Sequence, residues 1–305
     1  ADAEPLHKHA LSIKEKNLGK DHPDVAITLG NMALLYMELG RYIEAEPLFK
    51  RSLSIHAKAH GKDHPHYSAS LGNLAQLYFQ QSRYADADSL YKKTLSIREK
   101  VLGKNHPNVA VTLNNLATLY IHLERYIDAE ALLKRALFIN EKVLGPVHPN
   151  VGTSLDNLAL IYADQKRYVD AETFFKRALS IKEKALGNDH PNVAVTLNNL
   201  AVLLARQGRD ADAELLYKRT LDIEEKTFGP DHLVVSSVLK NLAVLYQDQG
   251  NYADAESLYK QALSIKEKVL VSDHPEVTEI LLDLSRLYQD LKKNKESFDH
   301  IRRAV

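Results

Sequence analysis

The sequence predicts an all-α solenoid in which one antiparallel pair of helices is repeated every 42 residues. Three observations predict this fold. A twelve-residue segment, His-Pro-Asn-Val-Ala-Val-Thr-Leu-Asn-Asn-Leu-Ala, occupies positions 106–117 and occurs again, unchanged, at 190–201. Three residue types recur at intervals of 42 along almost the entire chain. Each interval also contains two separate stripes of apolar residues with helical spacing.

The recurring markers are a histidine, an asparagine and a glycine. The histidines are His22, His64, His106, His148, His190, His232 and His274, and a proline follows each except His232. The asparagines are Asn31, Asn73, Asn115, Asn157, Asn199 and Asn241, with Asp283 in the seventh place. The glycines are Gly19, Gly61, Gly103, Gly145, Gly187 and Gly229, and Val271 breaks that series. This regularity is typical of a repeat protein.

The first helix of each pair, helix A, is clearest in the third repeat. It should begin at Pro107, where the missing N–H of proline costs nothing, with Asn105 or His106 near the cap. It should end near residues 124–125. The apolar spacing predicts a buried stripe formed by Val109, Leu113, Leu116, Ala117 and Tyr120.

The second helix, helix B, should run from about residue 128 to 143 and close at Gly145, which can take a positive φ. Only a short turn, filled by Tyr126, joins helix A to helix B, so the two should pack antiparallel. The predicted buried positions of helix B are Ala129, Leu132, Leu133, Ala136, Leu137 and Phe138.

We expect residues 1–305 to form a single array. Residues 1–18 match helix B of a preceding repeat, six whole repeats occupy about 21–272, and 273–305 form a seventh repeat that is partly degenerate and truncated. Because the chain opens inside a helix B, we expect it to be a piece of a longer protein. Apolar surface at that end would allow end-to-end self-association.

Composition excludes several classes of function. Forty basic residues balance forty acidic ones, so no net field favours nucleic acid or an anionic membrane. The sequence has neither a run of 18 apolar residues nor a signal-peptide pattern, so we expect no membrane association. The absence of cysteine excludes disulfides and thiolate metal sites and fits a cytoplasmic location.

The repeat resembles the tetratricopeptide repeat (TPR). The positions that carry the resemblance in the third repeat are Leu113, Leu116, Ala117, Tyr120, Tyr126, Ala129, Leu133 and Ala136. The usual TPR has about 34 residues, whereas this one has 42 and lacks the proline that ends helix B. Its length, its Gly-Lys-Asp-His-Pro loop and its Leu-Asn-Asn-Leu-Ala segment are similar to the variant found in kinesin light chains. The resemblance implies a right-handed superhelix whose helices A line a concave groove.

By the geometry of that family, helix A residues at and around the marker asparagine face the groove. The residues around the asparagine vary between repeats, whereas the packing residues do not. The asparagines could hydrogen-bond the backbone of an extended peptide, and their variable neighbours would supply specificity. The candidate peptide-binding residues are Asn73, Asn114, Asn115, Asn157, Asn198, Asn199, Asn241, Gln76, Phe79, His122, Arg206 and Lys240. The sequence therefore favours a module that binds a protein or peptide partner.

The main alternative is a structural scaffold. In that hypothesis each asparagine bonds to a neighbouring helix and fixes the stacking, and partners contact the edges or ends of the array. A carboxylate clamp of the kind that some TPR domains use is not expected, because no Lys or Arg stands one turn before the asparagine. Those positions hold Ile27, Ala69, Val111, Thr153, Val195, Ser237 and Glu279.

Other kinds of site are weakly indicated. The marker histidines are better explained by helix capping than by metal binding, and a loop trio of His60, His64 and His66 without cysteine is weak evidence for a metal. Pairs of basic residues on the helices B have acidic residues four positions earlier, which favours a solvated, ion-paired face over a phosphate-binding one. No catalytic motif occurs, so we expect neither an enzyme nor a cofactor.

Two repeats depart from the pattern. The fifth has Leu204 and Asp210 where the others have tyrosines, which should weaken its packing by about 1–3 kcal/mol. The seventh lacks several consensus residues, among them the ones replaced by Val271, Asp283, Asn294 and Ser297, and resembles a terminal capping repeat.

Overall fold

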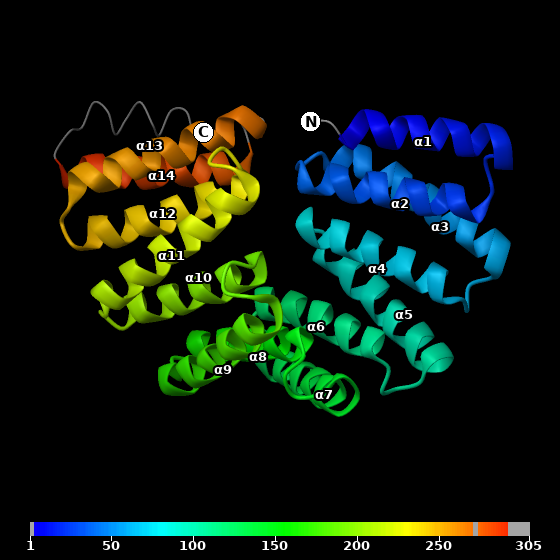
Figure 1. Ribbon diagram of the computed structural model, residues 1–305, viewed down its shortest axis with the longest axis horizontal. Helices are drawn as coiled ribbons and strands as arrows, with labels where there is room; N and C mark the ends of the chain where they lie inside the picture. The colour runs from blue at the N-terminus through cyan, green and yellow to red at the C-terminus, as the bar shows by residue number, and fades with distance from the viewer. Residues whose placement is uncertain (1–2, 271–273, 292–305) are drawn as a thin grey trace. The chain divides into compact units, whose positions relative to one another are not determined.

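The structure is a computed structural model that describes residues 3–270 and 274–291. The last helix B and the replacements at Val271, Asn294 and Ser297 lie outside the described residues. Within those residues every regular element is an α-helix (Figure 1). The helices are α1 (Ala3–Leu18), α2 (Pro23–Glu38), α3 (Tyr42–His60), α4 (Pro65–Gln80), α5 (Tyr84–Leu102), α6 (Pro107–His122), α7 (Tyr126–Leu144), α8 (Pro149–Asp164), α9 (Tyr168–Leu186), α10 (Pro191–Arg206), α11 (Asp210–Phe228), α12 (Leu233–Asp248), α13 (Tyr252–Val269) and α14 (Pro275–Asp290).

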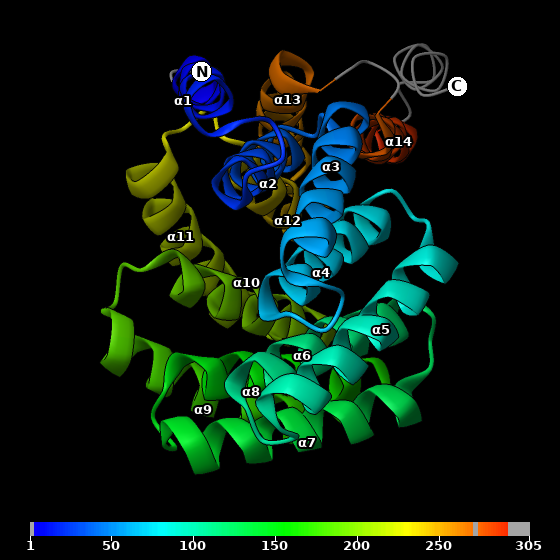
Figure 2. The same cartoon turned by 90° about the vertical axis from the view of Figure 1, so that its right-hand side faces the viewer.

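The chain forms two compact units, residues 1–161 and 162–305. Consecutive helices lie side by side from α1 to α7 in the first unit and from α9 to α14 in the second (Figure 1 and Figure 2). In the first unit α4 also contacts α2 and α6, and in the second α10 contacts α12. The even-numbered helices are the predicted helices A, and the surface they form within each unit is called the A-helix face below. The predicted all-α solenoid of repeated helix pairs is confirmed.

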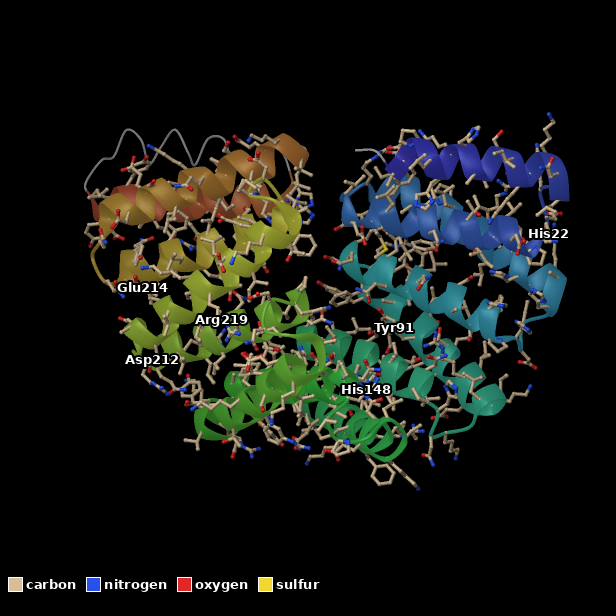
Figure 3. All side chains as sticks on the ribbon, viewed as in Figure 1. His22, Tyr91, His148, Asp212, Glu214 and Arg219 are labelled. Carbon is tan, nitrogen blue, oxygen red and sulfur yellow. The ribbon has the colours of Figure 1, made fainter. Side chains whose placement is uncertain are left out.

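Helix A starts where the sequence predicted. Pro107 is its first residue, and the Nδ1 atom of His106 accepts a hydrogen bond of 3.1 Å from the N–H of Asn108. All seven marker histidines cap a helix in this way, and Figure 3 labels two of them, His22 and His148. The helix ends at His122, earlier than predicted, because Glu124 takes a φ of 56° and turns the chain.

Helix B is slightly longer than predicted, from Tyr126 to Leu144, and Gly145 follows it with the expected positive φ of 90°. Its core includes Ala129, Leu133 and Ala136, as predicted. Phe138 was wrongly placed in the core, since its side chain is 58% exposed. Helical spacing carries the buried stripe from Ala136 to the next turn, at Ile139 and Asn140, and leaves Phe138 on the outer side.

Packing is local to neighbouring pairs. One buried cluster joins Val109 and Leu113 of α6 to Ala136 and Ile139 of α7, with Leu95 of the preceding α5 packed against it. Within this unit the α6–α7 pair therefore buries apolar surface on the pair before it, as a repeat array requires.

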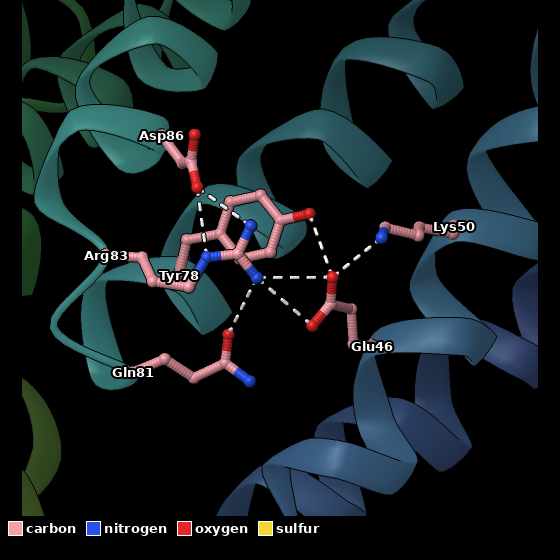
Figure 4. A network of polar contacts seen from close by, with 6 residues as sticks. All are labelled: Glu46, Lys50, Tyr78, Gln81, Arg83 and Asp86. Carbon is pink, nitrogen blue, oxygen red and sulfur yellow. Dashed lines mark hydrogen bonds and ion pairs between the residues drawn. The ribbon is translucent and has the colours of Figure 1, made fainter.

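A polar contact also links consecutive pairs (Figure 4). Glu46 of α3 accepts a hydrogen bond of 3.1 Å from the hydroxyl of Tyr78 and lies 3.2 Å from a guanidinium nitrogen of Arg83, both in the following pair. Lys50, one turn along α3, pairs with the same carboxylate at 2.7 Å and, with Arg83 and Tyr78, lowers its pKa. The same tyrosine-to-acid bond links Tyr36 to Glu4, Tyr120 to Asp88, Tyr246 to Glu214 and Tyr288 to Glu256.

Candidate functional site

A cavity of about 400 Å³ opens on the A-helix face of the first unit. It combines side chains from the helix A of one repeat, the helix B of the same repeat and the next helix A. Three predicted site residues, Asn73, Gln76 and Asn115, meet there. The complete lining is Gly72, Asn73, Gln76, Tyr91, Thr94, Arg98, Val111, Thr112 and Asn115.

Arg98 and Tyr91 of α5, which the sequence analysis did not predict, add a guanidinium and a phenol to the lining of this cavity. The Nη1 atom of Arg98 donates to the carbonyl oxygen of Asn108 at 2.9 Å and to Oγ1 of Thr112 at 2.8 Å. Within the described parts of the chain no carboxylate pairs with this guanidinium, and its partial burial lowers its pKa. Tyr91, buried between α4 and α5 (Figure 3), donates to Oε1 of Gln76 at 2.6 Å. The cavity is thus polar and cationic.

Phe79 and His122 form a second part of the same face. Their rings meet edge to face with centroids 4.9 Å apart, and Tyr84 lies within 6.5 Å of both. The three side chains form an aromatic cluster at the end of α4 and α6, where the helices turn. Such a cluster can contact an apolar or aromatic group of a ligand.

The asparagines differ in what they touch. Asn114 is only 7% exposed, and its amide donates to Oγ of Ser154 at 3.2 Å and accepts from it at 3.3 Å. This contact joins α6 to α8, so Asn114 lies in the packing of two repeats rather than at the open surface. Asn157, on α8, is half-buried.

In the second unit the predicted residues are spread over two cavities, each of about 240 Å³. Arg206 and Asn241 line the first, and Arg206 is held by Asp164 at 3.3 Å. Asn241 and Lys240 line the other, where Lys240 pairs with Glu279. The amide of Asn241 also donates to Oδ1 of Asn198 at 3.0 Å. Asn199 is half-buried on α10.

Comparison with known protein families identifies the repeat. Tetratricopeptide repeat models match residues 24–100, 73–142, 108–184, 153–226, 216–268 and 235–305, and a related model of the same repeat matches 1–24. The chain belongs to the tetratricopeptide repeat family. TPR arrays are protein–protein interaction modules, so this chain is one as well.

Solved structures agree with this assignment. A kinesin light chain-like protein of Podosopora anserina, with nearly identical TPR-like repeats, is 26% identical over 68% of this chain and 98% of its own, with a TM-score of 0.52. BtubC of P. vanneervenii is 23% identical over 77% of this chain and 91% of its own, with a TM-score of 0.57. Aspartyl phosphate phosphatase F of Bacillus subtilis shares the fold: it is 16% identical over 96% of this chain and 73% of its own, with a TM-score of 0.65. No curated protein matches the sequence significantly.

Basic residues on the helices B of the TPR array pair with acidic residues one turn earlier. The predicted acid-to-lysine pairs on the helices B are confirmed at Lys50, Lys92, Lys134, Lys176 and Lys218, all within 2.7 Å. In the portion of the chain that the structure covers, no three His, Asp or Glu side chains are placed to hold a metal ion. No described helix is long and apolar enough to cross a membrane.

Proposed function

We propose that this TPR chain binds an extended segment of a partner protein along its A-helix face. The observation that carries the proposal is the 400 Å³ cavity between α4, α5 and α6, where Asn73, Asn115 and Arg98 converge. Protein interiors are close-packed, so an open space of this size is available to a ligand.

The chemistry of the cavity suits a peptide. Each carboxamide of Asn73 and Asn115 can donate to a backbone carbonyl and accept from a backbone N–H. Arg98 offers further N–H groups, because Nη1 alone makes its two bonds to Asn108 and Thr112. The aromatic cluster of Phe79, Tyr84 and His122 would take an apolar side chain of the same segment. We propose no catalysis and no cofactor for this role, and a cytoplasmic location for the protein.

One pair of contacts favours the alternative, a structural scaffold that meets partners, or other copies of itself, through edges or ends. Asn114 is bonded to Ser154, and Asn198 to Asn241, so these amides fix the stacking of neighbouring repeats. Asn73 and Asn115 have no such contact among the described residues and are the better candidates for ligand binding.

A random-peptide display library, panned against the intact chain, tests the proposal. The counter-screen is the double variant Asn115→Ala/Asn199→Ala, which removes one amide from the A-helix face of each unit. The matched control is Asn105→Ala/Asn188→Ala, which changes two loop asparagines outside that face. Peptides that share a motif, bind the control and lose binding to the first double variant would support the groove. Enrichment that ignores the first variant, or no enrichment, would reject it in favour of the edges or of a scaffold.

A further inference from the structure

A glutamine of α12 connects a tyrosine to an acid on the A-helix face of the second unit. The Oε1 atom of Gln247 accepts a hydrogen bond of 3.1 Å from the hydroxyl of Tyr259, on α13. Its Nε2 atom donates a hydrogen bond of 2.8 Å to Oδ2 of Asp290, on α14. A carboxamide can make both contacts because it accepts at one atom and donates at the other. This contact of Tyr259, Gln247 and Asp290 is called the carboxamide bridge below.

One repeat earlier, the two ends of the carboxamide bridge are present and its middle is not. At the positions 42 residues before the three members of the bridge stand Tyr217, Ala205 and Asp248. The tyrosine and the acid are unchanged, but the methyl group of Ala205 can neither accept nor donate a hydrogen bond. The chain therefore contains the same arrangement with and without its glutamine.

The hydroxyl of Tyr217 has no acceptor in this arrangement. In the second repeat the equivalent Tyr91 donates to Gln76, which stands at another position of helix A. Val202 takes the place of that second glutamine in the fifth repeat. Tyr217 is only 3% exposed, and its hydroxyl forms no hydrogen bond among the described residues. Because buried hydroxyl groups are nearly always hydrogen-bonded, this one suits a ligand that carries an acceptor.

Asp248 also lacks the donor that its counterpart has. Within the described ranges its carboxylate forms no ion pair and accepts no hydrogen bond. Burial and the nearby carboxylate of Asp210 raise its pKa, as expected for an acid that no cation neutralises. Arg206 lies on the preceding helix A, but Asp164 holds its guanidinium at 3.3 Å. Asp248 is therefore available to an N–H donor.

One cavity brings these groups together. Ala205, Tyr217 and Asp248 all line the cavity of about 240 Å³ that α10, α11 and α12 form on the A-helix face. The two polar residues that a glutamine connects in the next repeat therefore border the same space. Val202 and Val244 also line it, and their apolar side chains suit the methylene stem of a long side chain. The space and its polar groups thus match the glutamine that this repeat lacks.

We propose that this cavity takes the side chain of a glutamine from the bound partner. Its carboxamide oxygen would accept from the hydroxyl of Tyr217, and its N–H would donate to Asp248, which repeats the contacts of the carboxamide bridge. A lysine or arginine head is disfavoured because Arg206 lines the same cavity, and an apolar side chain would leave both polar groups unbonded. This proposal rests on the proposed function, since it names one residue of the segment bound on the A-helix face.

Four peptide pools test the subsite on the intact chain. All are acetylated and amidated nonapeptides, randomised except at the centre, which is fixed as glutamine, as methionine (apolar and of similar length), as glutamate or as lysine. Retention on the immobilised protein is measured by mass spectrometry. We expect about a tenfold preference for the glutamine pool over the methionine pool, since two hydrogen bonds, one of them to a charged acceptor, are worth about that factor. The glutamate and lysine pools should also be retained less than the glutamine pool.

Variants assign the preference to this cavity. Ala205→Gln gives the chain its own glutamine at the position equivalent to Gln247. It should reduce the preference to about twofold or less and raise the midpoint of thermal unfolding by about 2 °C, because it completes the carboxamide bridge. Tyr217→Phe removes one of the two hydrogen bonds and should reduce the preference to about threefold. Ala211→Gln, at an exposed position of α11, is the matched control and should change neither quantity.

Several results would overturn the subsite alone. One is retention of the pools without a glutamine preference, or with stronger retention of the lysine or methionine pool. Another is a preference that survives both Ala205→Gln and Tyr217→Phe. An unchanged unfolding midpoint in Ala205→Gln would show that Tyr217 and Asp248 are not placed to hold a carboxamide, which also overturns it. No retention of any pool would overturn the subsite and the proposed function together.

Discussion

The hydroxyl of Tyr78 donates a hydrogen bond of 3.1 Å to Glu46, which lies 32 residues earlier, in the preceding helix pair. The ring of the same tyrosine supports Arg83, whose guanidinium carbon stands 3.7 Å from the ring centroid. One side chain thus contacts an acid and a base and joins two repeats. Because the bond recurs at other junctions of both units, its strength bears on the cohesion of each unit.

Tyr78→Phe should lower the free energy of unfolding by about 1 kcal/mol, because it removes one hydrogen bond to a charged acceptor and keeps the ring. The measurement is urea unfolding of the wild type, of Tyr78→Phe, of Glu46→Gln and of the double variant. The two single changes should be less than additive, since they remove the same contact. Tyr84→Phe is the matched control, since among the described residues that hydroxyl has one hydrogen-bond partner, Ser82, at the long distance of 3.4 Å. Equal effects of Tyr78→Phe and Tyr84→Phe would show that the hydrogen bond from Tyr78 to Glu46 does not stabilise the junction.

Glu224 should make stability fall as pH rises. Burial raises the pKa of its carboxyl from 4.5 to about 7, so the folded chain holds this proton more tightly than the unfolded chain. The protonated carboxyl of Glu224 therefore contributes fully to the stability of the folded state below pH 4.5, and this contribution is lost as pH rises to about 7. At pH 8 the wild type should be less stable than Glu224→Gln by up to about 3 kcal/mol, and at pH 4.5 the two should be nearly equal.

Urea unfolding of both proteins between pH 4.5 and 8 gives that difference. Glu224→Asn/Val238→Ser should match Glu224→Gln in its pH dependence and exceed it in stability, since it copies Asn140 and Ser154, which are hydrogen-bonded at 3.3 Å at the equivalent positions 84 residues earlier. A difference between wild type and Glu224→Gln that does not change with pH would show that the carboxyl stays ionised when folded.

His56 should have the opposite pH dependence. It is 3% exposed, its Nδ1 has no partner in the described structure, and the rings of His60 and His66 lie 5.9 and 5.3 Å away. Burial, with the neighbouring histidines, lowers its pKa from 6.5 to about 4. The neutral, buried ring of His56 therefore contributes fully to the stability of the folded state above pH 6.5, and this contribution is lost as pH falls towards 4.

His56→Asn copies the residue of the equivalent position 140 and removes the titrating group. Thermal unfolding should show the wild type losing stability, relative to this variant, by up to about 3 kcal/mol between pH 6.5 and 4. His9→Asn, at an exposed position of α1, should leave the pH profile unchanged. A parallel pair of profiles for wild type and His56→Asn would contradict the prediction.

Most of the fold could be predicted because its signals are local. His106 and Pro107 mark the start of a helix by their own chemistry, and the apolar stripe of helix A is complete in one repeat. The end of helix A was placed too late because Glu124 adopts a positive φ that its residue type does not indicate, whereas Gly40 and Gly208 do so at the equivalent positions. Phe138 is apolar, but the helical spacing of α7 places it on the solvent-exposed side of the helix.

The site was only partly predictable because it is made between repeats. Asn73, Gln76 and Asn115 could be proposed from helix A alone. Arg98 comes from helix B, at a position that varies between repeats among constant neighbours. Asn114 and Asn198 are the same residue at the same position, yet they bond differently because the residue 40 positions later is Ser154 in one case and Val238 in the other.

The fifth repeat should be the least stable of the complete ones. Leu204 occupies the place of the junction tyrosine and is 4% exposed, so the core is filled, but it cannot donate to Glu172. Arg209 of the fifth repeat still reaches that carboxylate, at 3.0 Å, and Lys176 pairs with it from α9 at 2.7 Å. Amide hydrogen exchange should therefore be faster in α10 and α11 than in α6 and α7, where Tyr120 bonds to Asp88 at 3.0 Å. Leu204→Tyr should slow exchange in α10 and α11, because it restores the bond to Glu172, and should leave α6 and α7 unchanged. Slower exchange in the fifth repeat than in the third would show that the missing hydroxyl does not limit the stability of the junction.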